Sequence, residues 1–219
     1  PDSRQLHVDF ADTVEMGRNM FRAAARACNN EGQITILNGD PRVSIFADFN
    51  DGIFDEYNSH KDDDYANIEL IEDVAYGYDM PDQSTTEAQA LIKNYPDMDV
   101  IICPTTVAIL SAAKIIQDNH LDIKVTGIGL PSEMINYFEN GICDEMYLWD
   151  VYEYGALTAY SLKALCDGEI TGAVGDTFIA GDMGEYTVEE RAVDGGTMVM
   201  MGDGMMFDNS NIKEWADKL

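Results

Sequence analysis

Three short turns in the sequence carry residues that suit a neutral, hydroxyl-rich ligand. The turns are Pro104-Thr105-Thr106, Gly129-Leu130-Pro131 and Trp149-Asp150. Proline fixes the backbone, a threonine offers a hydroxyl, and an aspartate accepts hydrogen bonds from two hydroxyls at once. A tryptophan ring supplies an apolar face for the carbon side of a sugar ring. The turns therefore predict a site for a small polyhydroxylated molecule. The alternative is that the same residues, Thr105 above all, only cap helices and turn the chain.

Each turn comes directly after a short apolar run that is typical of a buried strand. The runs are 99–103, 124–129 and 143–149, and helical patterns follow them over 105–119, 131–140 and 150–166. Repeated strand–helix units predict a parallel sheet with right-handed crossovers. Ligands bind at the carboxyl edge of the strands in open sheets of this kind. We therefore expect the turns to lie together at that edge.

The rest of the chain shows the same alternation until it becomes glycine-rich after Gly168. A first helix, capped at Asp12-Thr13, has an apolar stripe of Val14, Gly17, Phe21, Ala24 and Cys28. We then expect a strand over 33–38, a helix over 48–58, an edge strand over 68–76, a helix that Ser84 caps, and late strands over 177–180, 185–188 and 197–201 before a closing helix over 208–215. The predicted fold class is α/β, with a three-layer, doubly wound parallel sheet.

The chain is strongly acidic, with 41 acidic and 13 basic residues among 219 and a net charge of -28. Nucleic-acid binders neutralise phosphates with lysine and arginine, so this balance argues against nucleic acid as a partner. It also disfavours anionic membrane surfaces. We interpret the charge as a solvated surface, and the run Asp62-Asp63-Asp64 as part of it.

The sequence offers no pattern for catalysis, a metal or a cofactor. It contains neither a GxSxG nucleophile elbow nor a glycine-rich phosphate loop. His7, His60 and His120 lie far apart, and no CxxC pair exists. We interpret Cys28, Cys103, Cys143 and Cys166 as free structural thiols. No apolar run is long enough for a membrane span, and no signal peptide is recognisable.

Four stretches give the chain a family likeness: 91–106, 125–134, 141–150 and Phe207–Ile212. On these residues it resembles type I periplasmic solute-binding proteins of sugar ABC transporters, especially the rhamnose-binding and autoinducer-2-binding group. The Pro-Thr-Thr and Gly-Leu-Pro pieces are the more rhamnose-like ones. The resemblance implies a Rossmann-like, two-lobed clamp that closes on a sugar between the strand ends of its lobes.

The resemblance also implies which residues contact the ligand. Pro104 and Thr106 match the family's ligand-contacting turn, Leu130 and Pro131 match the next one, and Asp150 matches a contact at the second crossover. The family has a polar pair where this chain has Ile45 and Phe46, so two hydrogen-bond partners are absent. The predicted ligand-binding set is Pro104, Thr105, Thr106, Leu130, Pro131, Asp150 and Phe46, with no catalytic residue, metal or cofactor.

The chain also differs from the family in its extent. In the family, most of the N-terminal lobe precedes the first crossover between the lobes, and Pro1 to Arg4 match that crossover. We therefore expect a C-terminal ligand-binding lobe over 6–148, elements of an incomplete N-terminal lobe over 150–180, and a segment over 181–219 that returns to the C-terminal lobe. Helix 150–167 should lack the sheet that it packs against. Its exposed apolar face predicts a homodimer or a swapped arrangement.

The predicted function is the solute-binding component of a sugar ABC importer, in the periplasm or at the extracellular surface, with a membrane permease as partner. It would bind a small, rhamnose-like or autoinducer-2-like sugar without chemistry. Two alternatives keep the fold: an extracytoplasmic sugar-sensing module of a signalling receptor, and a degenerate interaction domain that binds no ligand. An enzyme is disfavoured because no acid–base pair or nucleophile is identifiable.

Overall fold

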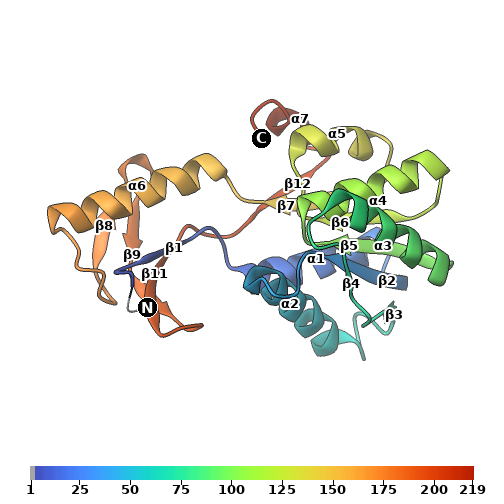
Figure 1. The fold of residues 1–219 in the computed structure, drawn as a ribbon, viewed down its shortest axis with the longest axis horizontal. Helices are drawn as coiled ribbons and strands as arrows, with labels where there is room; N and C mark the ends of the chain where they lie inside the picture. The colour runs from blue at the N-terminus through green and yellow to red at the C-terminus, as the bar shows by residue number, and fades with distance from the viewer. Residues whose placement is uncertain (1–2) are drawn as a thin grey trace. The chain divides into compact units, whose positions relative to one another are not determined.

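The computed structural model describes residues 3–219 and divides them into two compact units (Figure 1). The large unit comprises Thr13–Leu148 and Met206–Leu219, and the small unit comprises residues 3–12 with Trp149–Met205. Among the described residues, no helix combines the length and the apolar character that crossing a membrane requires.

A parallel sheet forms the centre of the large unit. Strand β2 (Glu31–Asn38) pairs with β5 (Met98–Cys103), and β5 pairs with β6 (Lys124–Gly127). On its other side β2 pairs with β3 (Asn67–Leu70) and, further along, with β4 (Ala75–Tyr76). Isolated parallel bridges join β6 to the segment of β7 (Glu145–Leu148), which pairs with β12 (Met205–Asp208). The predicted parallel α/β sheet is therefore confirmed.

Helices cover both faces of this sheet, which gives the predicted three layers (Figure 1). Helices α1 (Thr13–Ala27) and α2 (Ser44–His60) pack together, and α1 also contacts β5 and β6. Helices α3 (Pro81–Asn94), α4 (Thr106–Asn119) and α5 (Pro131–Glu139) form the other layer, with the short α7 (Ile212–Trp215) against α5. Because helices cover both of its faces, β5 buries the apolar run at 100–103, while Asp99 is only partly buried.

Glycines allow α1 and α2 to approach closely. A Cβ atom on Gly17 would lie 2.3 Å from the Phe49 carbonyl oxygen, and one on Gly52 would lie 2.0 Å from that of Val14. Phe21 and Ala24, which share the predicted stripe with Gly17, are fully buried. The stripe therefore faces the core, as its helical spacing predicts.

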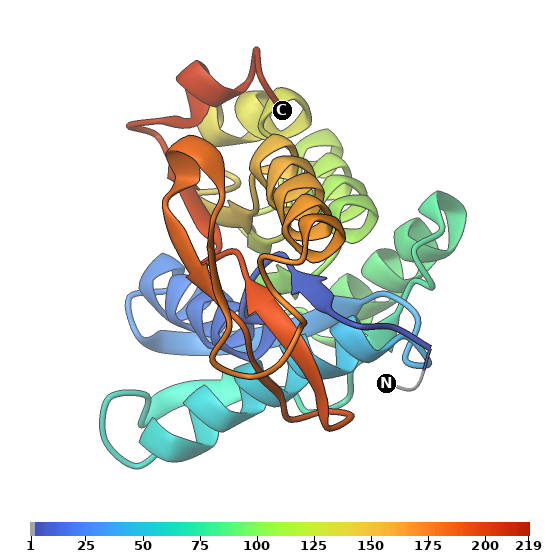
Figure 2. The ribbon, with the colours of Figure 1, turned by 90° about the vertical axis from the view of Figure 1, so that its left-hand side faces the viewer.

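The small unit is a β layer covered by α6 (Val151–Asp167) (Figures 1 and 2). Strand β1 (His7–Asp9) pairs in parallel with β11 (Gly196–Met200), and β11 pairs antiparallel with β10 (Glu189–Arg191). Strands β8 (Thr177–Ile179) and β9 (Glu185–Thr187) form an antiparallel pair around a 3₁₀ turn at Gly181–Met183. Its core is made by Leu157, Ala164, Ile170, Phe178, Ala180, Val188 and Val199.

The units divide the chain at different residues from those that we expected. Residues 6–12 lie in the small unit because β1 pairs with β11. Residues 181–205 lie there too, since β9, β10 and β11 pair within that unit, so the returning segment covers 206–219. The prediction that the apolar face of α6 lacks a sheet to pack against was wrong. Leu157 and Ser161 on that face are buried, and α6 contacts β1 and β8.

Three other local predictions need correction. Ser84 does not cap α3, because Pro81 occupies the first turn, which its fixed φ suits, and Met80 is the N-cap. The expected strand over 68–76 is two strands, β3 and β4. The expected closing helix over 208–215 begins at Ile212, and β12 extends to Asp208.

Candidate functional site

The candidate site is the carboxyl edge of the parallel sheet in the large unit. Strands β2, β5 and β6 end side by side there, because Ile36 of β2 pairs with Ile102 of β5, and Cys103 of β5 pairs with Gly127 of β6. Helices α2, α4 and α5 follow the ends of these three strands, and α3 follows the end of β4. Helix N-termini carry unsatisfied N–H groups and partial positive charge, so this edge can donate hydrogen bonds to ligand oxygens.

The turn after β5 brings Pro104, Thr105 and Thr106 to this edge. Thr105 is buried, and its Oγ1 accepts a hydrogen bond from the Ala108 N–H at 3.0 Å, so it is the N-cap of α4. The capping alternative therefore holds for Thr105. Pro104 is buried as well, whereas Thr106 is half-buried and forms no side-chain hydrogen bond among residues 3–219. Of the three, Thr106 has the hydroxyl that is free for a ligand.

The turn after β6 is held close to β5 by a glycine. Gly127 has φ 144°, and a Cβ atom there would lie 1.9 Å from the Cys103 carbonyl oxygen. That oxygen instead accepts a hydrogen bond from the Ile128 N–H at 3.0 Å. The chain then places Leu130, half-buried, at the N-cap of α5 and Pro131, buried, at its first position. Leu130 can offer an apolar contact. Pro131 restricts the backbone of Leu130 to an extended conformation.

The turn after β2 supplies two charged residues that the sequence analysis missed, and the first turn of α2 supplies Phe46. The Phe46 ring lies over Gly39, where a Cβ atom would be 2.3 Å from the ring. Buried Asn38 holds this turn by donating to the Phe46 carbonyl oxygen at 2.9 Å. Arg42 donates to both Asp40 carboxylate oxygens, which lowers the pKa of Asp40 to about 2. Their place next to Pro41, after a strand end, was the available signal.

The turn after β4 was missed entirely. Tyr78 and Asp79 have φ 52° and 56°, in the left-handed region that non-glycine residues rarely adopt. The Gly77 N–H donates to the Asn38 carbonyl oxygen at 2.8 Å, which fixes this turn beside the end of β2. Tyr78 and Met80 are exposed. Neither left-handed position is a glycine, so this turn was not predicted from the sequence.

Trp149 and Asp150 lie in the small unit, at the start of α6. Asp150 Oδ1 accepts hydrogen bonds from the Tyr152 and Glu153 N–H groups at 2.8 and 3.0 Å, so it is the N-cap of α6. The Trp149 ring is half-buried against Phe10, with ring centroids 4.0 Å apart. Phe10 also meets the edge of Tyr154 at 6.0 Å. Phe10 was missed because no motif surrounds it.

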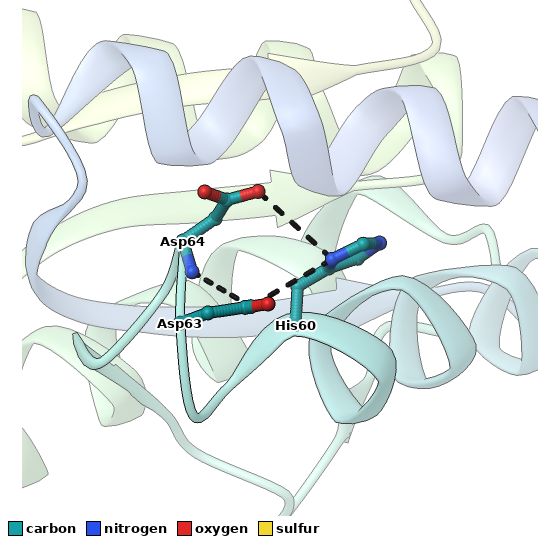
Figure 3. Close-up of side chains that lie close together, drawn as sticks. All are labelled: His60, Asp63 and Asp64. Carbon is teal, nitrogen blue, oxygen red and sulfur yellow. Dashed lines mark hydrogen bonds and ion pairs between the residues drawn. The ribbon is translucent and has the colours of Figure 1, made fainter.

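One group outside this edge brings metal-ligating side chains together (Figure 3). His60 Nδ1, at the end of α2, lies 3.8 Å from Asp63 Oδ1 and 3.9 Å from Asp64 Oδ2. The three side chains are 42%, 70% and 77% exposed, so Asp63 and Asp64 lie on the surface as predicted. Water satisfies exposed charges of this kind, and we assign the group no function.

The four cysteines are free thiols. Burial raises the pKa of both the Cys103 and the Cys143 thiol well above the ordinary value. Thiols held protonated in this way are poor nucleophiles. Their environment is therefore that of packing residues in the sheet.

Comparison with known proteins gives a family. The model of the periplasmic binding protein domain matches residues 1–170. An ABC transporter solute-binding protein from Clostridium phytofermentas, solved with bound L-rhamnose, is 33% identical, with a TM-score of 0.89 over 100% of this chain and 70% of that one. A sugar ABC transporter protein from Actinomyces odontolyticus is 31% identical, with a TM-score of 0.83 over 98% of this chain and 67% of that one.

A more distant structure shares the fold. LsrB from Clostridium saccharobutylicum, solved in complex with AI-2, is 19% identical, with a TM-score of 0.83 over 98% of this chain and 71% of that one. The family model matches most of the chain, and the parallel sheet with turns at its carboxyl edge is consistent with that match. The chain belongs to the periplasmic binding protein family, among the type I solute-binding proteins of sugar ABC transporters.

Proposed function

We propose that this chain is the solute-binding component of a sugar ABC importer and that it binds a small, rhamnose-like or autoinducer-2-like sugar without changing it. The observation that carries the proposal is the 33% identity to a rhamnose-bound solute-binding protein over the whole chain. Proteins of this family bind ligands without catalysis, and they work outside the cytoplasm. The proposed partner is a membrane permease, and the proposed location is the periplasm or the extracellular surface.

Within the large unit, we assign ligand contacts to residues that have free groups at the carboxyl edge. Thr106 would exchange hydrogen bonds with a sugar hydroxyl, and Leu130 and Phe46 would contact its carbon face. Arg42 and Asp40 would supply polar groups near the position where the family's polar pair is replaced by Ile45 and Phe46. Pro104, Thr105 and Pro131 would position this edge.

Within the small unit, Trp149 and Asp150 are the proposed contacts. The Phe10 ring holds Trp149 in place, which lowers the entropy cost of stacking a sugar on its other face. Asp150 uses Oδ1 to cap α6, and Oδ2 remains available for a ligand hydroxyl. The proposed homodimer would use the outer side of α6, where Tyr152 and Leu162 are 73% and 61% exposed, because Leu157 and Ser161 of the face first expected to be free are buried within the small unit.

The degenerate alternative has one observation in its favour, because Thr105 and Asp150 both act as helix caps. Calorimetric titration with L-rhamnose, ribose and autoinducer-2 separates the proposals. Saturable binding of rhamnose or autoinducer-2 that Thr106→Val and Trp149→Ala weaken would support the sugar-binding function. Folded protein that binds none of the three sugars would contradict it and favour an interaction domain.

A further inference from the structure

A cavity of about 310 Å³ lies on the flank of the large unit's sheet. Its wall consists of the connection from β3 to β4 on one side and the second half of α3 on the other. The residues that matter for its chemistry are Asp73, Tyr76, Tyr78, Glu87, Asn94 and Tyr95. Strand β4 pairs with β2 along one edge, which leaves the other edge open beside α3. The volume is at the lower end of the range for small-molecule sites.

The fixed charges around this cavity are negative. Asp73 and Glu87 contribute two carboxylates, and among residues 3–219 neither forms an ion pair, although Glu87 accepts a hydrogen bond from Gln83 Nε2 at 2.9 Å. Helix α3 ends at Asn94, so the carbonyl groups of its last turn add partial negative charge. These contributions favour a positively charged occupant.

Basic side chains do not neutralise this charge. Among the described residues, no lysine or arginine lines the cavity. Lys93, in the last turn of α3, lines a different cavity next to α4. Arg42 is not in the lining, and it is paired with Asp40 at 2.5 Å.

Three tyrosine rings supply the rest of the cavity's chemistry. Tyr76 and Tyr95 are half-buried, and Tyr78 is 45% exposed. Aromatic faces attract ammonium groups, and such contacts strengthen where water is excluded. Tyr78 is held at φ 52°, a strained conformation that persists only where the surrounding structure enforces it. Aromatic rings combined with unpaired carboxylates are the features of an ammonium site.

We propose that this cavity binds a small organic cation, a primary or quaternary ammonium ion, at a second site that is independent of sugar binding. The probe pair is choline and 3,3-dimethylbutan-1-ol, because the two molecules have nearly the same shape and differ in charge. Both are titrated into the full chain at low ionic strength, with calorimetry and amide chemical shifts as readouts. We expect choline to bind about tenfold more tightly than the alcohol, which corresponds to about 1.4 kcal/mol. Shift changes should centre on 73–78 and 87–95.

Variants then tie binding to the cavity. Asp73→Asn with Glu87→Gln should weaken choline binding about tenfold, and Tyr95→Leu should weaken it severalfold. Asp62→Asn, an exposed carboxylate on the surface after α2, is the control for net charge and should leave binding unchanged. Circular dichroism verifies that each variant folds. Equal affinity for the two probes, no binding of choline by the parent chain, or binding that the folded cavity variants leave intact would overturn the proposal.

Discussion

The rings of Phe10 and Trp149 lie with their centroids 4.0 Å apart and their planes tilted by 33°. Phe10 precedes the first passage of the chain into the large unit, and Trp149 follows the next passage out of it. Both residues are half-buried, so the two rings are packed and still partly accessible. That arrangement supports the proposed role of Trp149 in stacking a sugar.

Replacing Trp149 should therefore affect binding and fluorescence together. Trp149→Ala is expected to weaken rhamnose binding about tenfold, because loss of an aromatic stacking contact costs about 1.4 kcal/mol. The chain has two tryptophans, and the other, Trp215, packs against Phe207 in the large unit. Sugar should change the fluorescence of the Trp215→Phe protein and leave that of Trp149→Phe unchanged. If sugar changed the fluorescence of Trp149→Phe and not that of Trp215→Phe, Trp149 would not contact the sugar.

The contact between α1 and α2 gives a prediction for stability. Gly17→Ala should lower the free energy of unfolding by about 2 to 3 kcal/mol, since the new Cβ would overlap the Phe49 carbonyl oxygen. Gly155→Ala in α6 is the matched control, because a Cβ there meets nothing within 4 Å. It should raise stability by about 0.5 to 1 kcal/mol through helix propensity. Urea denaturation measures both, and equal effects would contradict the close contact.

The adjacent threonines should separate stability from binding. Thr105→Val removes the cap of α4 and should lower the free energy of unfolding by about 1 kcal/mol. Thr105→Ser keeps a hydroxyl at the cap and should retain most of that stability. Thr106→Val should change stability by less than about 0.5 kcal/mol. It should weaken sugar binding about fivefold, the effect of one neutral hydrogen bond. If Thr106→Val destabilised the fold as much as Thr105→Val, its hydroxyl would have a structural role.

Tyr65 should make stability depend on pH in alkaline solution. Its hydroxyl donates to Glu56 Oε1 at 2.8 Å, and Arg22 pairs with Glu56 at 2.7 Å. Burial and the Glu56 carboxylate raise the pKa of Tyr65 from 10 to about 12. The unfolded chain loses this proton at lower pH than the folded protein, so stability should fall as pH rises from 10 to about 12.

The comparison with Tyr65→Phe isolates this contribution. The variant should lose about 1.5 to 3 kcal/mol at neutral pH, because a hydrogen bond to a charged group is broken. The difference in stability between the two proteins should then shrink above pH 10. A difference that stays constant up to pH 12 would show that Tyr65 titrates alike in both states.

The sequence predicted best those elements whose determinants are local. The apolar run of β5, the proline at the start of α5 and the stripe on α1 each produce their structure through neighbouring residues. The sequence predicted poorly what depends on distant pairing. Strand β1 is three residues long and exists because it pairs with β11 near the other end of the chain. Nothing near His7 indicates that partner.

The candidate site shows the same limit. Its strand-end turns were predictable, because parallel strands bring their carboxyl ends together. The division of roles within a turn was not, since Thr105 and Thr106 differ only in which hydroxyl meets the backbone of α4. Tyr78 and Asp79 are the two central residues of a tight turn that the Met80 N–H closes on the Gly77 carbonyl oxygen at 3.0 Å, and they were missed because neither of them is a glycine.

The unequal burial of the thiols has a practical consequence. Cys103 and Cys143 are fully buried, Cys28 is half-buried with a raised pKa, and Cys166 at the end of α6 is exposed. A maleimide dye at neutral pH should therefore attach to Cys166 and spare the other thiols. The native chain already carries a selective attachment point on its small unit, where a fluorophore would report changes in the surroundings of α6 when a ligand is added.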